Sequence, residues 1–345
     1  MAHQLHQGNK TQKIKLMTTA VPLNRNSSID TLRGFACILL VAYHVIGPFP
    51  DSGLNVQHGA LKDVNELLFY IRMPIFTFLS GFVYAWRPFE SGWKTFVSGK
   101  IRRLIVPMLF VGTLFALVQI VTPGTNSRIT NWHFLHLLPV AHYWFIESLF
   151  LLFLLLIPLE HFRVLHNKKS FTLLFVIAAI LYVTNAGTPW LSIAGTFYLF
   201  PYFLAGLYCS RFPMQFKNQN ALGYLLLIAL MFFLLFYAQQ YGGQRRSLNA
   251  LIIGTTFCTA LLFTKVESAF LASIGIYSYS IYLFHVFFTA ASRIFFRKIG
   301  ITNIWWLFIL GLAFGLIGPI LLDQIASKYN PSRMLLLGKR PIKKS

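Results

Sequence analysis

Four ionisable side chains fall inside strongly apolar stretches of this 345-residue sequence: His44, Arg72, Glu147 and His285. An ionisable residue within a membrane-spanning helix is costly and is therefore a candidate for a functional site. A carboxylate beside an imidazole fixes its tautomer and stabilises the imidazolium that forms on protonation. Arginine can neutralise a carboxylate or stabilise charge that develops on an oxygen. These residue types predict a proton-transfer site; the alternative is a set of buried ion pairs that hold helices together.

The first apolar stretch, residues 28–48, carries a further ionisable residue in line with His44. Arg33 lies eleven positions earlier, and at about 100° per helical residue this spacing returns to nearly the same face, about 16 Å along the axis. Asp30 lies one turn before Arg33. The pattern predicts a polar track along one helix. The alternative is a snorkelling arginine together with a histidine that is satisfied by a backbone carbonyl.

The composition predicts the element that carries these residues. Hydrophobic residues make up 56% of the chain and charged residues 11%, and the mean hydropathy is +0.61. Repeated apolar runs of about 20 residues can each cross about 30 Å of hydrocarbon. We therefore expect an all-α polytopic transmembrane helical bundle. About ten spans are expected, at 28–48, 67–86, 104–121, 142–159, 170–185, 192–209, 221–238, 248–264, 270–290 and 303–322.

The charge distribution predicts the orientation of this bundle. A net charge of +21 could indicate a nucleic-acid partner, but the Lys and Arg residues lie in short loops and at both ends. Segments on the side of the N-terminus hold about threefold more of them than segments on the other side, which predicts cytoplasmic termini and an inner-membrane location, with no nucleic acid bound. The expected parts are a polar tail at 1–27 without a cleavable signal, a transmembrane domain at 28–322 and a basic tail at 323–345 on the lipid surface.

This orientation converts sequence position into depth, at 1.5 Å per helical residue. Four side chains from four spans fall at similar depth in the outer half: His44, Arg72, Glu147 and His285. A second group falls near the inner face and forms a positive mouth suited to a phosphate-bearing cytosolic ligand: Arg33 with Asp30, and Lys100, Arg102 and Arg103 in the adjoining basic loop. The alternative for this group is ordinary positive-inside charge.

Other distinctive residues receive simpler interpretations. The outer connection at 122–141 and the residues after it, which include His142 and Trp144, are typical of an interfacial aromatic belt; a lid or a sugar-stacking surface is the alternative. The three cysteines, Cys37, Cys209 and Cys258, fall within expected spans. They lack paired or metal-ligand spacing, so we expect apolar fillers and no metal site.

Five segments resemble, in order, motifs of the acyltransferase 3 family of integral membrane acyltransferases. They are residues 29–36 continuing to Tyr43 and His44, then 72–82, 102–107, 142–147 and 274–285. The resemblance implies transfer of an acyl group, usually acetyl, from cytosolic acyl-CoA to a hydroxyl of an outer surface polysaccharide or lipid-linked glycan. His44 and Arg33 would take the essential histidine and arginine roles of the family. Ser80 and Gly81 would take its serine–glycine helix contact beside the donor.

Together these observations predict a membrane O-acyltransferase. Acyl-CoA would bind through Arg33, Arg102 and Arg103. His44 would act as general base, oriented by Glu147, in a catalytic group with Arg72 and His285 in which Ser280 or Tyr279 assists. The competing class is a transporter or flippase that uses the same cluster as a proton relay or substrate site.

Overall fold

The computed structural model describes residues 26–47, 52–122, 131–214, 216–236 and 246–342. These residues form helices joined by short turns, and no strand occurs among them. The all-α prediction is therefore confirmed. Most of the predicted N-terminal tail and the last three residues of the chain lie outside the described residues.

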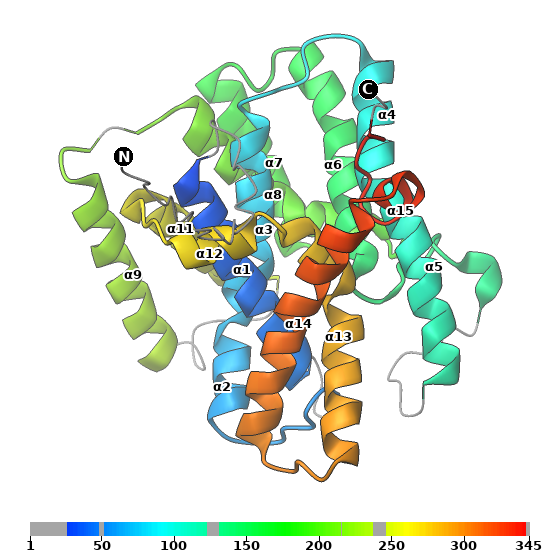
Figure 1. The fold of residues 1–345 in the computed structure, drawn as a ribbon. Coiled ribbons are helices and arrows are strands. Elements are labelled where there is room, and N and C mark those ends of the chain that lie inside the picture. The colour runs from blue at the N-terminus through cyan, green and yellow to red at the C-terminus, as the bar shows by residue number, and fades with distance from the viewer. Residues whose placement is uncertain (1–25, 48–51, 123–130, 215, 237–245, 343–345) are drawn as a thin grey trace, which may run out of the picture.

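The helices are arranged as one bundle (Figure 1). The long ones are α1 (Ser27–Ile46), α3 (Phe69–Tyr84), α5 (Val106–Val121), α6 (Trp144–His161), α7 (Lys168–Val183), α8 (Ile193–Arg211), α9 (Gln219–Phe236), α11 (Leu248–Thr264), α13 (Ser278–Lys298) and α14 (Ile304–Ala326). The short ones are α2 (Ala60–Leu67), α4 (Trp93–Lys100), α12 (Ala269–Gly275) and α15 (Asn330–Leu335).

The outward faces of this bundle are apolar. On α9, Leu225, Ile228 and Phe236 are 63%, 67% and 68% exposed, a pattern that suits contact with lipid rather than water. Within the described ranges, seven helices are long and apolar enough to cross a membrane, or eight if the bent pair α2–α3 counts as one span. The chain is thus a multi-pass membrane protein. The count of ten stays a prediction, because α7 and α11 are shorter, at 16 and 17 residues.

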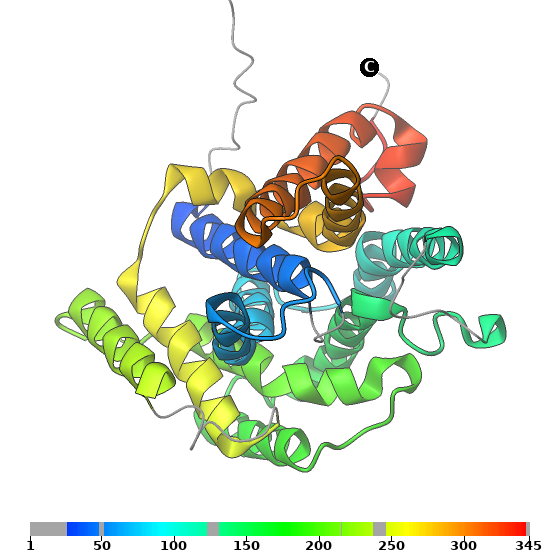
Figure 2. The same ribbon diagram turned by 90° about the horizontal axis from the view of Figure 1, so that it is seen from below.

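Helix α1 lies at the centre of the bundle, in contact with α3, α12, α13 and α14 (Figure 2). Its contact with α12 is made backbone to backbone. A Cβ atom on Gly34 would lie 1.9 Å from the Leu271 carbonyl oxygen, and one on Gly275 would lie 1.9 Å from the Asp30 carbonyl oxygen. The first turns of α1 are therefore fixed against α12.

A second backbone contact of this kind joins α3 to α8. A Cβ atom on Gly81 would lie 2.0 Å from the Phe203 carbonyl oxygen, and one on Gly206 would lie 1.9 Å from the Phe78 carbonyl oxygen. Only glycine lets two helices approach this closely. Gly81 thus makes a tight helix contact, and its partner is α8.

Three expected boundaries differ from the structure. The stretch 270–290 is not one helix, because α12 is held against the start of α1 while α13 begins at Ser278 and packs along α14. The span expected at 67–86 corresponds to α3, but a further short helix, α2, comes directly before it at an angle of 42°. The basic stretch Ile101–Ile105, expected in a loop, is a π-helical turn that joins α4 to α5. Pro107 follows it, lacks an N–H and crowds the carbonyl four residues earlier, which favours such a widened turn.

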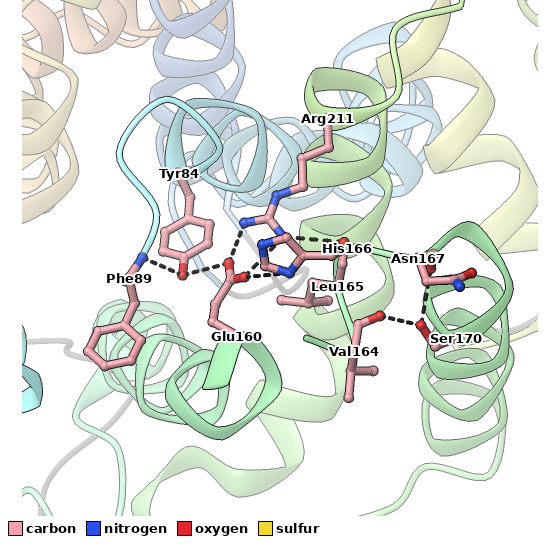
Figure 3. Close-up of polar contacts among 9 residues, drawn as sticks. All are labelled: Tyr84, Phe89, Glu160, Val164, Leu165, His166, Asn167, Ser170 and Arg211. Atoms are coloured by element: carbon pink, nitrogen blue, oxygen red, sulfur yellow. Dashed lines mark hydrogen bonds and ion pairs between the residues drawn. The ribbon is translucent and has the colours of Figure 1, made fainter. Parts of the chain in front are cut away.

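A buried ionic network fixes the ends of α3, α6 and α8 (Figure 3). The carboxylate of Glu160 pairs with the Arg211 guanidinium and accepts a 3.0 Å hydrogen bond from the Tyr84 hydroxyl. The Phe89 N–H in turn donates to that hydroxyl at 3.0 Å. His166 lies 3.7 Å from the same carboxylate. Because Tyr84 ends α3 while Arg72 lies in its first turn, this network lies at the other end of α3 from Arg72.

Candidate active site

Three histidines from three segments meet in the bundle. His44 lies in the last turn of α1, His285 in α13, and His142 in a turn of 3-10 helix just before α6. The ring centroids are 4.7 Å apart for His44 and His285, 5.5 Å for His44 and His142, and 5.0 Å for His142 and His285. The structure thus brings together two of the predicted site residues. It adds His142, which the aromatic-belt interpretation missed although this residue opens the segment 142–147.

The tautomer of His285 follows from its backbone contacts. Its Nδ1 atom lies 2.8 Å from the Ile281 carbonyl oxygen and 3.0 Å from that of Tyr282. Because a carbonyl oxygen only accepts hydrogen bonds, Nδ1 carries the hydrogen and Nε2 of the neutral ring has a lone pair. The side chain is 0% exposed, and Nε2 has no hydrogen-bond partner among the described residues. His285 is therefore a buried acceptor beside His44.

His142 is held in this cluster by contacts between its own segment and α13. The Tyr282 hydroxyl donates to the His142 carbonyl oxygen. The neighbouring Tyr143 hydroxyl donates to the Leu283 carbonyl oxygen at 2.9 Å. Two hydrogen bonds in opposite directions thus join the turn to α13. The Nε2 atom of His142, like that of His285, lacks a hydrogen-bond partner within the described parts of the chain.

A cavity of about 840 Å³ opens beside the histidines. His44 and His142 line it, whereas His285 lies behind them and does not. The aromatic rings of Trp144 and Tyr198 form part of its wall. A ligand in the cavity can therefore touch two of the three imidazoles, and the third supports them from behind.

Arg72 also lines the cavity, and its side chain is held in place. It is 5% exposed, and its Nη1 donates to the Asn65 Oδ1 atom at 2.5 Å. The guanidinium carbon lies 3.7 Å from the centroid of the Tyr43 ring. Asn65 in turn donates to the Gly47 carbonyl oxygen at 3.1 Å. The cation therefore lies next to the turn that carries His44, as the depth argument predicted.

Glu147 has a different neighbour from the expected one. Its Oε2 atom accepts a hydrogen bond from the hydroxyl of Ser192, and Ser192, not Glu147, lines the cavity. Ser192 has a left-handed backbone (φ 55°) just before α8, and its carbonyl oxygen accepts from the Ser148 hydroxyl at 3.0 Å. This turn places the Ser192 hydroxyl against Glu147 of α6. In the described structure the imidazole next to His44 is that of His285, and Glu147 is bonded to Ser192 rather than to His44.

The residues expected at the donor site lie apart from the cavity. Arg33 forms a 2.9 Å ion pair with Asp30, which is buried. Arg102 donates to the Gly338 carbonyl oxygen at 2.6 Å, and Arg103 is exposed beside it. The Ser80 hydroxyl donates to the Phe76 carbonyl oxygen within its own helix at 2.8 Å. The hydrogen bonds and ion pairs of the described residues do not join these side chains into one cluster.

Two further expected helpers have different surroundings. The Ser280 hydroxyl donates to Asp323 Oδ2 at 2.5 Å, and Lys339 of the C-terminal segment bonds the other oxygen of that carboxylate at 2.6 Å. Tyr279 has a buried hydroxyl with no partner in the described part of the molecule. Among all residues that the structure describes, no group of three His, Cys, Asp or Glu side chains could hold a metal ion.

Comparison with known families decides the class of this chain. Residues 26–324 match the family model Acyl_transf_3, described as an acyltransferase domain. The chain belongs to the acyltransferase 3 family. The histidine cluster and the cavity of this acyltransferase lie within the matched range. No curated protein and no solved structure matched the chain.

The site chemistry agrees with this membership. Acyltransferase 3 proteins are in general membrane O-acyltransferases, and transfer to an oxygen requires removal of a hydroxyl proton. Neutral imidazole is the side chain best suited to accept that proton near neutral pH. A guanidinium on the same cavity wall can stabilise an oxyanion.

Proposed function

We propose that this acyltransferase moves an acetyl or another short acyl group from cytosolic acyl-CoA to a hydroxyl of an extracytoplasmic polysaccharide or glycoconjugate of the cell envelope. The observation that carries the proposal is the position of His44. It lies on the wall of a large cavity, with His285 behind it and Arg72 beside it.

In this mechanism His44 is the general base. The acceptor hydroxyl loses its proton to His44, and its oxygen attacks the thioester carbonyl carbon. The bond to sulfur then breaks, and the CoA thiolate takes the proton back from the imidazolium. Such a base contributes on the order of 10²–10⁴ in rate.

The other side chains of the cavity support these steps. Arg72 stabilises the negative charge that develops on the thioester oxygen. His285 Nε2 has no partner among the described residues, and in the reacting complex of this scheme its lone pair would accept the N–H of the His44 ring, which leaves the other nitrogen of that ring free to act as the base. In this scheme Glu147 acts through Ser192, by orienting a hydroxyl on the cavity wall.

The donor approaches from the opposite end of α1. Its phosphates bind Arg33, whose guanidinium Asp30 holds in place, together with Arg102 and Arg103, and Ser80 lies beside its path. The pantetheine arm then covers the rise of about 16 Å between Arg33 and His44. The proposal includes cytoplasmic termini and an inner-membrane location, with the cavity on the outer side.

The test combines mass spectrometry of cells with an assay on their membranes. Cells that express the wild-type chain or His44→Ala are compared by mass spectrometry of their envelope glycans, and CoA release from acetyl-CoA is measured in membranes of both. We expect acyl groups on the glycan and CoA release with the wild type only. Equal acylation by the two proteins would remove His44 from the mechanism. Wild-type membranes that release no CoA with any envelope glycan fraction would overturn the proposed activity.

A further inference from the structure

The cavity beside the histidines is strongly positive. Three arginines line it, Arg72, Arg246 and Arg293, and no Lys, Asp or Glu occurs among the described residues of its wall. Charges in a site with apolar walls are screened far less than charges in water. A positive cavity of this kind attracts an anion and disfavours a cation.

Arg246 is held on one wall by neutral partners. Its Nη2 donates to the Ala194 carbonyl oxygen at 2.9 Å, and its guanidinium carbon lies 5.3 Å from the centroid of the Tyr198 ring. The side chain is half-buried. No carboxylate forms an ion pair with it in the part of the chain that the structure describes.

Arg293 is held on another wall in the same way. It lies eight residues after His285 on α13, a rise of about 12 Å. Its Nη1 donates to the Gly53 carbonyl oxygen at 2.7 Å, and among the described ranges it too has no carboxylate partner. Each guanidinium has five N–H donors, and the hydrogen bond of each to a protein carbonyl oxygen uses one nitrogen.

We propose that Arg246 and Arg293 bind an anionic group, a carboxylate or a phosphate, on the acceptor glycan. That the anion belongs to an acyl acceptor rests on the function proposed above; the anion site itself rests on the cavity and its charges. Guanidinium groups match carboxylate and phosphate oxygens with paired hydrogen bonds. Trp144, which also lines the cavity and is partly exposed, supplies a flat surface for the sugar ring.

Binding to the purified full-length chain tests this site without requiring turnover. The probes are trigalacturonate as the carboxylate source, glucose 1-phosphate as the phosphate source and maltotriose as the neutral control, titrated at constant ionic strength. We expect an anionic probe to bind at least tenfold more tightly than maltotriose. Arg246→Gln and Arg293→Gln should each weaken that binding by about tenfold, the size of one lost charge-assisted hydrogen bond.

Arg297→Gln is the matched control. Arg297 donates to the Leu54 carbonyl oxygen at 3.1 Å, on the same loop that Arg293 contacts, but it does not line the cavity. Its substitution should leave binding within twofold of the wild type, which separates cavity binding from a general charge effect.

The outcomes distinguish the two proposals. Preference for one anionic probe assigns the source of the charge. Equal binding of neutral and anionic probes, or binding that both glutamine variants retain, overturns the anion site. Acylation of neutral glycans that is insensitive to both variants also overturns it and leaves the acyltransferase proposal standing. Anion binding by a wild-type protein that releases no CoA would support the anion site and overturn the acyltransferase proposal.

Discussion

His44 and His285 lie edge to face with their ring centroids 4.7 Å apart, one on the wall of the cavity and the other enclosed behind it. The inner ring is fixed in one tautomer by two backbone carbonyl oxygens of its own helix. The outer ring is the one a substrate can reach. In the proposed mechanism His44 would therefore contact the substrate, and His285 would orient the His44 ring.

Replacing His44 tests the first of these roles. We expect His44→Ala to lower kcat by 10²–10⁴, because the general base is lost, while the amount of protein in the membrane stays the same. The measurement is CoA release per molecule of purified protein. His161→Ala is the control, because His161 is exposed at the end of α6; it should retain full activity. A fully active His44→Ala protein would contradict the prediction.

Replacing His285 tests the second role. Asparagine can donate to the Ile281 carbonyl oxygen in place of Nδ1, but it lacks the acceptor at Nε2. We expect His285→Asn to lower kcat at least tenfold while KM for the acceptor stays within twofold. The unfolding temperature should be unchanged. A fall in the unfolding temperature with normal kcat would indicate a purely structural histidine.

The Glu160 network should act on stability rather than on catalysis. Glu160→Gln keeps an oxygen for the Tyr84 hydroxyl but leaves the Arg211 cation without its counter-charge. Breaking a buried ion pair costs about 3–5 kcal/mol, so the unfolding temperature in detergent should fall clearly.

Glu66→Gln is the comparison for this substitution. The Lys62–Glu66 ion pair is 3.8 Å long, and the Glu66 side chain is 69% exposed, so its loss should cost less than about 1 kcal/mol. Folded Glu160→Gln protein should retain wild-type kcat. Equal stability of the two variants would show that the network does not stabilise the bundle.

The glycine contact of α1 makes another stability prediction. Gly34→Ala places a methyl group 1.9 Å from the Leu271 carbonyl oxygen, so α12 must move away from α1. We expect a lower yield of folded protein and reduced activity, because α1 carries both Arg33 and His44. Gly99→Ala is the control, since a Cβ atom there meets nothing within 4 Å. Normal yield and activity of Gly34→Ala would show that the contact is dispensable.

Much of this arrangement follows from the sequence. Hydropathy predicts the helical bundle, and orientation together with helix depth predicts His44, Arg72, Glu147 and His285 at similar depth. These predictions rest on helix geometry, which is regular. The two histidines are in contact, and Arg72 lies on the cavity wall beside His44.

The remaining features depend on irregular backbone. The bond from Ser192 to Glu147 requires a left-handed turn, and the approach of His142 to His285 requires a short 3-10 turn tied to α13. The break between α12 and α13 depends on how closely Gly275 approaches the backbone of α1. Neither hydropathy nor residue spacing encodes these contacts, because they arise between segments far apart in the chain.

Under the proposed function, the glycine pairs would also constrain the path of the acyl donor. At Gly34, next to Arg33, the backbones of α1 and α12 touch, and at Gly81 those of α3 and α8 touch. Neither seam leaves room for a methylene chain. A pantetheine arm that starts at Arg33 must then follow a side of α1 that faces α3, α13 or α14. Side chains on those three helices, rather than on α12, would therefore set the longest acyl group that the enzyme accepts.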